Sequence, residues 1–243
     1  MSGGPVELFN RFFDPAGAWE MLSRYAHILS GITWIGLLYF FNFVQTPSFA
    51  EMSAEGRTEA QRKITWRALW WFRWAALVTF LFGLSIIAVQ DDMDNYFSGQ
   101  RGTAILTGML LGITMFLNVW GVIWRNQKVV IASAVAAASG GQANAAAPAA
   151  ARRAFLASRT NVVFSIPMLF FMGAASHFTL PAGGNHAAYW TSIIVLIALL
   201  EINALTAKTG PTTKPIEKIP GVIVTGFVVW AIAYALVRAF LSA

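Results

Sequence analysis

The chain has 243 residues, of which 57% are hydrophobic and only 12% are charged, with a formal net charge of +6, ten tryptophans and no cysteine. Soluble domains are about 45–50% apolar and about 25% charged, so the composition argues against an ordinary soluble enzyme, and the aromatic content argues against a disordered chain. The lack of cysteine excludes disulfides, thiolate metal sites, a catalytic thiol and covalent attachment of a c-type haem.

The first segment, residues 1–23, precedes the first long apolar run. It contains acidic residues, among them Glu7 and Glu20, and the run that follows is too long for the apolar region of a signal peptide. No cleavable signal peptide is therefore expected. Aromatic residues such as Trp19 are typical of segments at a membrane interface, and we expect residues 1–23 to lie at the outer surface.

Six apolar runs follow, and each is long enough to cross about 30 Å of hydrocarbon as a helix. Their predicted bounds are 24–45, 68–89, 103–124, 160–180, 188–207 and 221–241. Backbone polar groups in lipid need partners within their own segment, and the runs lack the alternation of a membrane β-strand. The sequence therefore predicts an all-α fold, a single polytopic membrane bundle of about six transmembrane helices over residues 24–243.

The orientation follows from the basic residues, because these accumulate in short cytoplasmic loops. Twelve of them fall in the loops after the first, third and fifth runs: Arg57, Arg62, Lys63, Arg67, Arg125, Lys128, Arg152, Arg153, Arg159, Lys208, Lys214 and Lys218. The opposite side carries the acidic cluster of Asp91, Asp92 and Asp94. Both termini are thus predicted on the outer, periplasmic side. The positive charge marks topology, so no nucleic-acid partner is expected.

Residues 131–151, between the third and fourth runs, are rich in alanine and contain Gly140, Gly141 and Pro148. Alanine favours helix, whereas paired glycines interrupt it. We interpret this stretch as a low-complexity, mobile cytoplasmic linker between two halves of three helices each.

Two histidines are predicted at the same depth in the membrane. His27 and His177 are 150 positions apart in the sequence, but the predicted topology places both about 5 Å inside the outer boundary, roughly one helical turn. Each has a glycine four residues away on the deeper side of the same helix face, Gly31 and Gly173 respectively, and residues at this spacing are stacked neighbours. The third histidine, His186, falls in the outer loop between the fourth and fifth runs.

Two imidazoles at one depth, with glycine-lined space beneath them, are the arrangement that a bis-histidine haem b needs, and such a haem requires no cysteine. The sequence therefore predicts haem b with His27 and His177 as iron ligands and with Gly31 and Gly173 beside the macrocycle. Two alternatives remain open. Interfacial histidines also reach water and small residues also pack transmembrane helices without a cofactor, and His186 could replace His177 as the ligand.

Two charged residues lie well inside the predicted runs, Glu201 as the only carboxylate and Arg73 as the only cation. An ionised carboxylate left unpaired in hydrocarbon costs several kcal/mol, so a structural ion pair between them is the first expectation. The functional alternative is a proton relay or the pocket of an anionic substrate. Tryptophans around Arg73 indicate an interfacial belt, and their spacing also allows cation–π packing on its guanidinium.

Several stretches resemble the family of bacterial membrane-bound urate oxidases, also called urate hydroxylases. They run from Arg24 to Gly36, Phe43 to Pro47, Ile123 to Lys128, Ser158 to Asn161 and Ser165 to His177. The last two stretches, in the fourth run, are the most specific part. The resemblance implies a multi-pass protein of the bacterial inner membrane that oxidises urate in purine catabolism and passes electrons toward cytochrome c.

In that family the membrane domain is typically joined to a C-terminal c-type cytochrome. This chain ends soon after the sixth run and has no cysteine, so a separate c-type cytochrome or another acceptor is the expected electron-transfer partner, beside the lipid bilayer and urate. Two other functions compete with this one. The chain could be a haem b electron-transfer subunit of another dehydrogenase or respiratory complex, without urate activity, or a channel or transporter without a cofactor.

Overall fold

The structure is a computed structural model that describes residues 15–90, 92–206 and 209–242. The described residues form helices joined by short connections and contain no strand, which confirms the predicted all-α class. Residues 1–14 of the expected interfacial segment, together with Asp91 and Lys208, lie outside the described residues.

Three short π-helical segments, η1 to η3, interrupt the helices of the first half. This half comprises α2 (Pro15–Tyr39), η1 (Phe40–Gln45), α3 (Thr46–Glu51), α4 (Ala54–Ala60), η2 (Gln61–Thr65), α5 (Trp66–Ala88), α6 (Met93–Phe97), α7 (Gly99–Leu117), η3 (Asn118–Ile123) and α8 (Trp124–Ala138). The second half comprises α9 (Ala147–His177), α10 (His186–Thr206), α11 (Lys214–Glu217) and α12 (Ile219–Leu241).

Six helical stretches among the described residues are long and apolar enough to cross a membrane, which confirms the predicted number. They are Gly17–Glu51, Ala54–Ala88, Gly99–Ala138, Ala147–His177, His186–Thr206 and Ile219–Leu241. The first three are 35, 35 and 40 residues long, so each is about 50–60 Å long at 1.5 Å per residue. They therefore extend beyond a hydrocarbon core of about 30 Å, and compared with the predicted bounds all three extend at the end where the loops are rich in basic residues.

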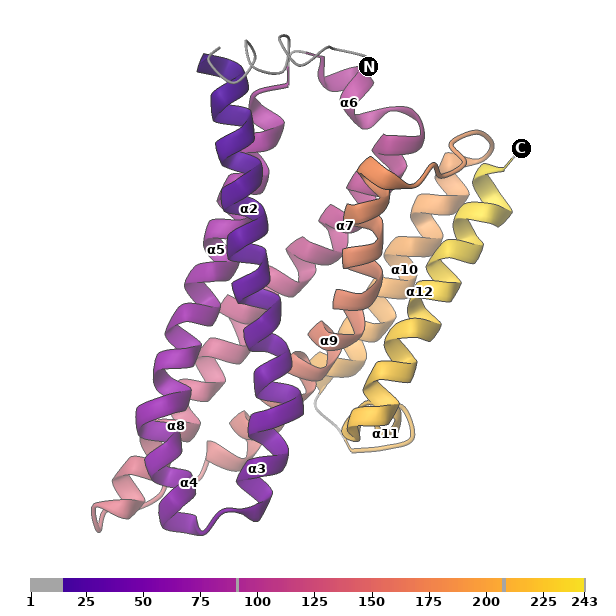
Figure 1. Ribbon diagram of the computed structural model, residues 1–243. Helices are drawn as coiled ribbons and strands as arrows, with labels where there is room; N and C mark the ends of the chain where they lie inside the picture. Colours follow the sequence, from indigo (N-terminus) through magenta and orange to yellow (C-terminus); the bar gives the residue numbers. More distant parts are fainter. Residues whose placement is uncertain (1–14, 91, 207–208, 243) are drawn as a thin grey trace.

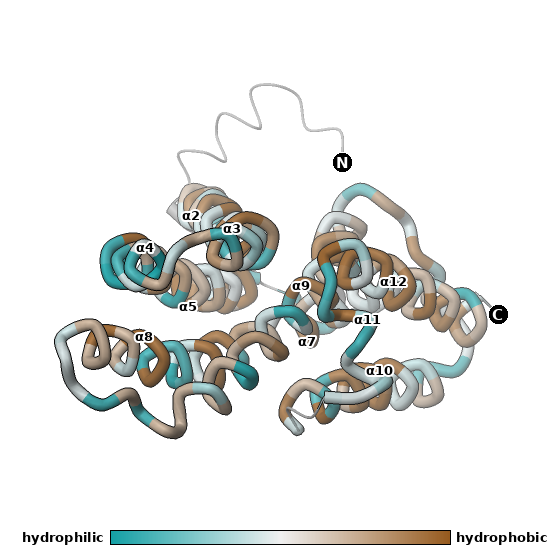
Figure 2. Tube along the Cα trace, turned by 90° about the horizontal axis from the view of Figure 1, so that it is seen from below, coloured by the Kyte–Doolittle hydropathy of each residue, from teal (hydrophilic) through white to brown (hydrophobic). Residues whose placement is uncertain are grey.

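The helices form two groups on either side of α9 (Figure 1). The view from below places α2 to α5 and α8 on one side and α10 to α12 on the other, with α9 between them (Figure 2). Burial agrees with this arrangement, because 67% of the most apolar window of α9 is buried, against 22–33% in the other five spans. Helix α9 is the central element, and both candidate cavities described below have a wall formed by it.

The predicted linker is largely helical. Helix α8 continues to Ala138 and α9 begins at Ala147, so that only residues 139–146 of the predicted 131–151 lie outside these two helices. The loop is also tied to α8, since the Ser133 hydroxyl accepts a hydrogen bond from the Asn144 backbone N–H at 2.9 Å. The strong helix propensity of alanine accounts for the longer helices, and Gly140, with φ of 80°, marks the end of α8.

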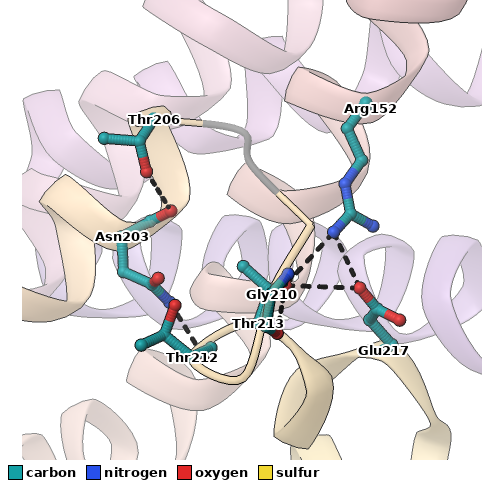
Figure 3. Close-up of polar contacts among 7 residues, drawn as sticks. All are labelled: Arg152, Asn203, Thr206, Gly210, Thr212, Thr213 and Glu217. Carbon is teal, nitrogen blue, oxygen red and sulfur yellow. Dashed lines mark hydrogen bonds and ion pairs between the residues drawn. The ribbon is translucent and has the colours of Figure 1, made fainter.

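The connection between α10 and α12 is held to α9 by polar contacts (Figure 3). An Arg152 Nη2 donates to Glu217 Oε1 at 2.7 Å and to the Thr213 hydroxyl at 3.3 Å. The hydrogen bond from Arg152 lowers the pKa of the Glu217 carboxyl below its ordinary value. On the other side of the loop, Asn203 Nδ2 donates to the carbonyl oxygen of Thr212 at 3.1 Å. These bonds fix the short helix α11 against the central helix.

Candidate functional site

A cavity of about 500 Å³ lies between α2, α5, α7 and α9. This volume falls within the range of about 300–1,000 Å³ that is typical of small-molecule and cofactor pockets. Most of the wall is apolar. It includes His27, Gly31 and Trp34 of α2, Thr79 and Gly83 of α5, Met109 and Gly112 of α7, and Met168 and Met172 of α9. A flat, largely hydrophobic group is the kind of ligand that such a wall suits.

His27 is held in one orientation within this wall. Its Nδ1 lies 2.8 Å from the carbonyl oxygen of Thr79, and because a carbonyl oxygen can only accept, Nδ1 carries the proton in this bond. The neutral ring then has an unprotonated Nε2, the form in which histidine binds a metal. Metal-ligating histidines commonly donate their other ring N–H to a backbone carbonyl in this way. The ring therefore has the hydrogen bonding expected of an iron ligand.

Gly83 makes room for this imidazole. A Cβ atom at position 83 would lie 3.2 Å from His27 Cε1 and 3.3 Å from Nδ1, closer than ordinary van der Waals contact. Gly31, predicted to leave space below the ring, does line the cavity, and a Cβ there would meet only the Thr79 methyl group at 3.8 Å. The glycine on α5 thus positions the ring, while the glycine on α2 leaves the space open.

The other predicted haem residues lie elsewhere. His177 is the last residue of α9, is exposed, and does not line the cavity. Gly173 is also exposed and has no atom within 4 Å of an added Cβ. His186, at the start of α10, is exposed with its Nε2 3.1 Å from the carbonyl oxygen of Ala182. The structure therefore brings His27 and Gly31 together at the cavity but not His177, and the bis-histidine pairing stays a prediction.

The expected ion pair between Arg73 and Glu201 is not formed. The Arg73 guanidinium carbon lies 3.8 Å from the centre of the Trp124 ring, and also packs against the rings of Trp74 and Trp120 at 5.6 and 5.5 Å. Cation–π contacts of this kind stabilise a cation without a carboxylate. Of the tryptophans that surround Arg73 in the sequence, only Trp74 packs on its guanidinium, and the other two rings come from η3 and α8. The ion pair is not formed because the arginine faces these two elements.

Glu201 belongs instead to an amide network. Its Oε2 accepts a hydrogen bond from Asn118 Nδ2 at 2.9 Å. The same nitrogen donates to Asn161 Oδ1 at 3.0 Å, and Asn161 Nδ2 donates to the carbonyl oxygen of Met115 at 3.0 Å. This network joins α7, α9 and α10 inside the bundle. Glu201 therefore has polar partners but no cation.

A family model described as "Urate oxidase N-terminal" matches residues 89–235. The chain belongs to the urate oxidase N-terminal family. No curated protein and no solved structure matches it. The match extends from the end of α5 into α12, so it includes His177 and Glu201, whereas His27 and Arg73 lie before it. The family relation is thus established by the part of the chain that forms α7 to α12.

The described residues contain no group of three or more histidine, aspartate or glutamate residues that could hold a metal ion. A metal held by a cluster of side chains is therefore not supported in the described part of the chain. A single histidine such as His27 can act as a metal ligand only where a cofactor itself supplies the remaining ligands, as the porphyrin ring of haem does.

One residue of the segment that matches the family was assigned to a loop by the sequence and lies in the interior of the structure. Arg159 is in α9, is 2% exposed, and its Nε and Nη1 have no hydrogen-bond partner. It is followed by Thr160, the predicted start of the fourth span, so a boundary one turn earlier would have placed it inside. The nearby polar pocket could not be found from the sequence, because its residues come from segments 41–69, 123–130 and 151–158.

Proposed function

We propose that the protein is a membrane oxidoreductase that oxidises urate and passes the electrons to a separate c-type cytochrome. The observation that carries the proposal is the urate oxidase family match over residues 89–235. Urate oxidation removes two electrons, and a c-type cytochrome accepts one at a time, so two cytochromes are reduced for each urate consumed. These 243 residues contain no cysteine, so they cannot themselves attach a haem c covalently.

Haem b in the cavity between α2, α5, α7 and α9 is the cofactor part of the proposal. The residues fit this group at His27, whose free Nε2 can bind iron, and at Gly31, which leaves the wall open. The apolar wall favours burial of a macrocycle. When bound, haem supplies one-electron redox chemistry, with a potential set by its ligands, hydrogen bonds and burial.

The second iron ligand is the open part of the haem proposal. His177 is the residue predicted from the sequence, but it does not line the cavity. The thioethers of Met109, Met168 and Met172 do line it, and histidine with methionine is a known axial pair. Single substitutions of His177 and of these methionines therefore distinguish the two arrangements.

The chain's own residues have defined tasks in this proposal. The Thr79 carbonyl oxygen accepts a hydrogen bond from the Nδ1–H of His27 and keeps the ring in one tautomer. The apolar side chains around the cavity exclude water, which strengthens electrostatic interactions inside. Gly83 allows the ring to pack directly against α5.

The membrane orientation is proposed from charge. The basic loops lie at the end of the bundle that holds α3, α4 and α11 (Figure 1), and short basic loops remain in the cytoplasm. In a bacterial inner membrane, the start of α2 and the end of α12 then face the periplasm. A c-type cytochrome on that side would take the electrons near the end of the bundle where His27 lies.

One observation favours a second candidate, a haem b electron-transfer subunit without urate activity. Helices α2 and α5, which provide His27 and Thr79, lie before the matched residues 89–235. The histidine cavity therefore depends on helices for which the family match gives no support.

The test uses the purified full chain in detergent, after expression with haem supplied. A pyridine haemochrome spectrum should show haem b in the wild type and in the control Gln100→Leu, an exposed position on α7, and none in His27→Ala. Loss of haem in His186→Ala would identify that residue as the second ligand. With urate and added cytochrome c, the wild type should reduce two cytochromes per urate. A folded wild type without haem would overturn the cofactor proposal, and haem without urate-dependent reduction would establish the electron-transfer subunit instead.

A further inference from the structure

A second, polar pocket of about 260 Å³ lies toward the basic end of the bundle. It is enclosed by η1 and α3, by η2 and α5, by η3 and α8, and by α9. Its wall contains four carboxamides, three hydroxyls and the rings of Phe41, Phe49 and Phe155. The polar side chains are those of Asn42, Gln45, Thr46, Gln61, Thr65, Gln127 and Ser158. A wall of this kind offers both hydrogen-bond donors and acceptors, unlike the apolar cavity around His27.

All three π-helical segments of the described chain contribute to this pocket. Asn42 and Gln45 belong to η1, Gln61 and Thr65 to η2, and Ile123 to η3. A π-helical turn is rare, because its hydrogen-bond geometry is less favourable than that of the α-helix, and such turns occur often at functional sites. Three of them around one pocket indicate that the position of its side chains, rather than helix stability, determines the local backbone.

Three of the five stretches that carry the resemblance to urate oxidases meet here, whereas the other two, Arg24 to Gly36 and Ser165 to His177, line the histidine cavity. The three stretches are far apart in the sequence, but Phe43 to Pro47 provides Gln45, Ile123 to Lys128 provides Gln127, and Ser158 to Asn161 provides Ser158. The pocket is therefore the place in the fold where these three separate stretches form a single surface.

Several of the carboxamides have hydrogen-bonding groups free for a ligand. Asn42 Nδ2 donates to Ser158 Oγ at 2.8 Å, which leaves its Oδ1 available, and Gln45 Oε1 accepts from Thr65 Oγ1 at 2.8 Å, which leaves its Nε2 available. Within the described part of the chain, the side chains of Gln61 and Gln127 make no hydrogen bond. A carboxamide presents a donor and an acceptor side by side, which matches the C=O and N–H groups along the edge of a heterocyclic imide.

Positive charge lies next to the pocket. The Arg159 guanidinium carbon is 5.1 Å from the centre of the Phe155 ring, and this ring forms part of the pocket wall. Arg159 is 2% exposed and two of its nitrogens have no hydrogen-bond partner. A buried cation without a counter-ion is costly, and an anion in the pocket would reduce that cost.

We propose that this pocket binds urate, as the planar monoanion present at neutral pH. The inference rests on the proposed function and adds the place where the substrate binds. The carboxamides of Gln61 and Gln127 pair with the C=O and N–H groups of the ring, Phe155 packs on its face, and Arg159 provides the favourable charge. The apolar cavity is unsuitable for urate, because most of the polar groups of the ring would lack partners there.

The position of the pocket also suits an anionic substrate that arrives from solution. The surrounding ends of α4, η2 and α8 carry Arg57, Arg62, Lys63, Arg125 and Lys128 beside the acidic Glu55 and Glu59, and Glu59 pairs with Arg62 and Lys63. The basic residues are in excess, and an excess of one sign raises the local concentration of an oppositely charged ligand, an effect that salt weakens. Urate then enters from the basic end, whereas the histidine cavity lies between α2, α5, α7 and α9.

The experiment measures binding of radiolabelled urate to the full chain by equilibrium dialysis, beside the KM for urate-dependent cytochrome c reduction. Gln127→Glu is nearly isosteric and adds a negative charge, and Arg159→Gln removes the positive one. Both should raise the Kd and the KM for urate at least tenfold and leave the haem spectrum unchanged. The matched control is Gln100→Leu, because Gln100 is an exposed carboxamide on α7 outside the pocket.

Hypoxanthine, an uncharged purine at neutral pH, separates charge from shape. As a competitor of urate, hypoxanthine should bind the wild type and Arg159→Gln with equal affinity. Gln61→Leu should weaken the binding of both hypoxanthine and urate. Unchanged urate affinity in Gln127→Glu and Arg159→Gln, with wild-type urate oxidation present, would overturn the pocket assignment and leave the proposed function standing. A wild type that neither binds nor oxidises urate would overturn both, and circular dichroism shows whether each variant is folded.

Discussion

Replacement of Asn161 by leucine tests whether the amide network holds the bundle together. Asn161 is fully buried, with 0% exposure, and makes two hydrogen bonds that leave its own helix, one to Asn118 and one to the Met115 carbonyl oxygen, each 3.0 Å long. Leucine has a similar volume and removes both. Hydrogen bonds between membrane helices contribute about 0.6 kcal/mol on average and up to about 1.7 kcal/mol. The loss of two bonds therefore lowers the free energy of unfolding by about 1–3 kcal/mol.

The measurement is reversible unfolding in mixed detergent micelles, followed by circular dichroism. The matched control is Asn126→Leu, because the Asn126 amide donates only to the Val122 carbonyl of its own helix, at 2.8 Å. The control should change the free energy of unfolding by less than about 0.5 kcal/mol, because Asn126 makes no hydrogen bond to another membrane-spanning helix. Equal effects of the two substitutions would refute the reasoning that the network joins α7, α9 and α10 energetically.

Three further predictions concern other positions. Gly83→Ala should displace the His27 imidazole, because the new Cβ would lie 3.2 Å from its Cε1, and should weaken haem b retention on a desalting column, whereas Gly121→Ala, with no atom within 4 Å of the new Cβ, should not. Gly226→Ala should lower the free energy of unfolding by about 1–3 kcal/mol in a detergent titration, since its Cβ would lie 2.4 Å from a side-chain atom of α9; an unchanged value would contradict the close packing of α9 and α12. The lowered pKa of Glu217 stabilises the fold above the unfolded-state pKa, and this contribution disappears as the pH falls through the lowered value, so Glu217→Gln should lose less thermal stability than the wild type between about pH 5 and pH 3.

The number of spans was predictable from the sequence because hydrocarbon imposes a minimum length on apolar runs. The ends of the first three helices could not be predicted in this way. Hydropathy falls where a helix leaves the membrane, whereas helix propensity can stay high beyond that point. Residues 131–138 show this directly, because the alanines that suggested a linker continue α8. Arg159 shows the same effect at the start of α9. Its charge indicated a loop, but the residue is buried within the helix.

The site was predictable only in part, for a related physical reason. Burial cost identifies a residue that needs a partner, but not which partner the fold provides, so Arg73 was paired with Glu201 although it packs on tryptophans. His27 and Gly31 do line one cavity, because they lie on the same helix face, and their role beside a haem stays a prediction. Depth alone could not place His177, since equal depth does not bring two helices together.

The most direct test of the central claim is an anaerobic spectrum of the purified full chain after addition of urate. The account predicts that urate reduces haem b, that dithionite gives the same reduced spectrum, and that His27→Ala shows neither signal. If dithionite reduces the haem of the wild type and urate does not, the chain does not oxidise urate through this haem and the central claim is wrong.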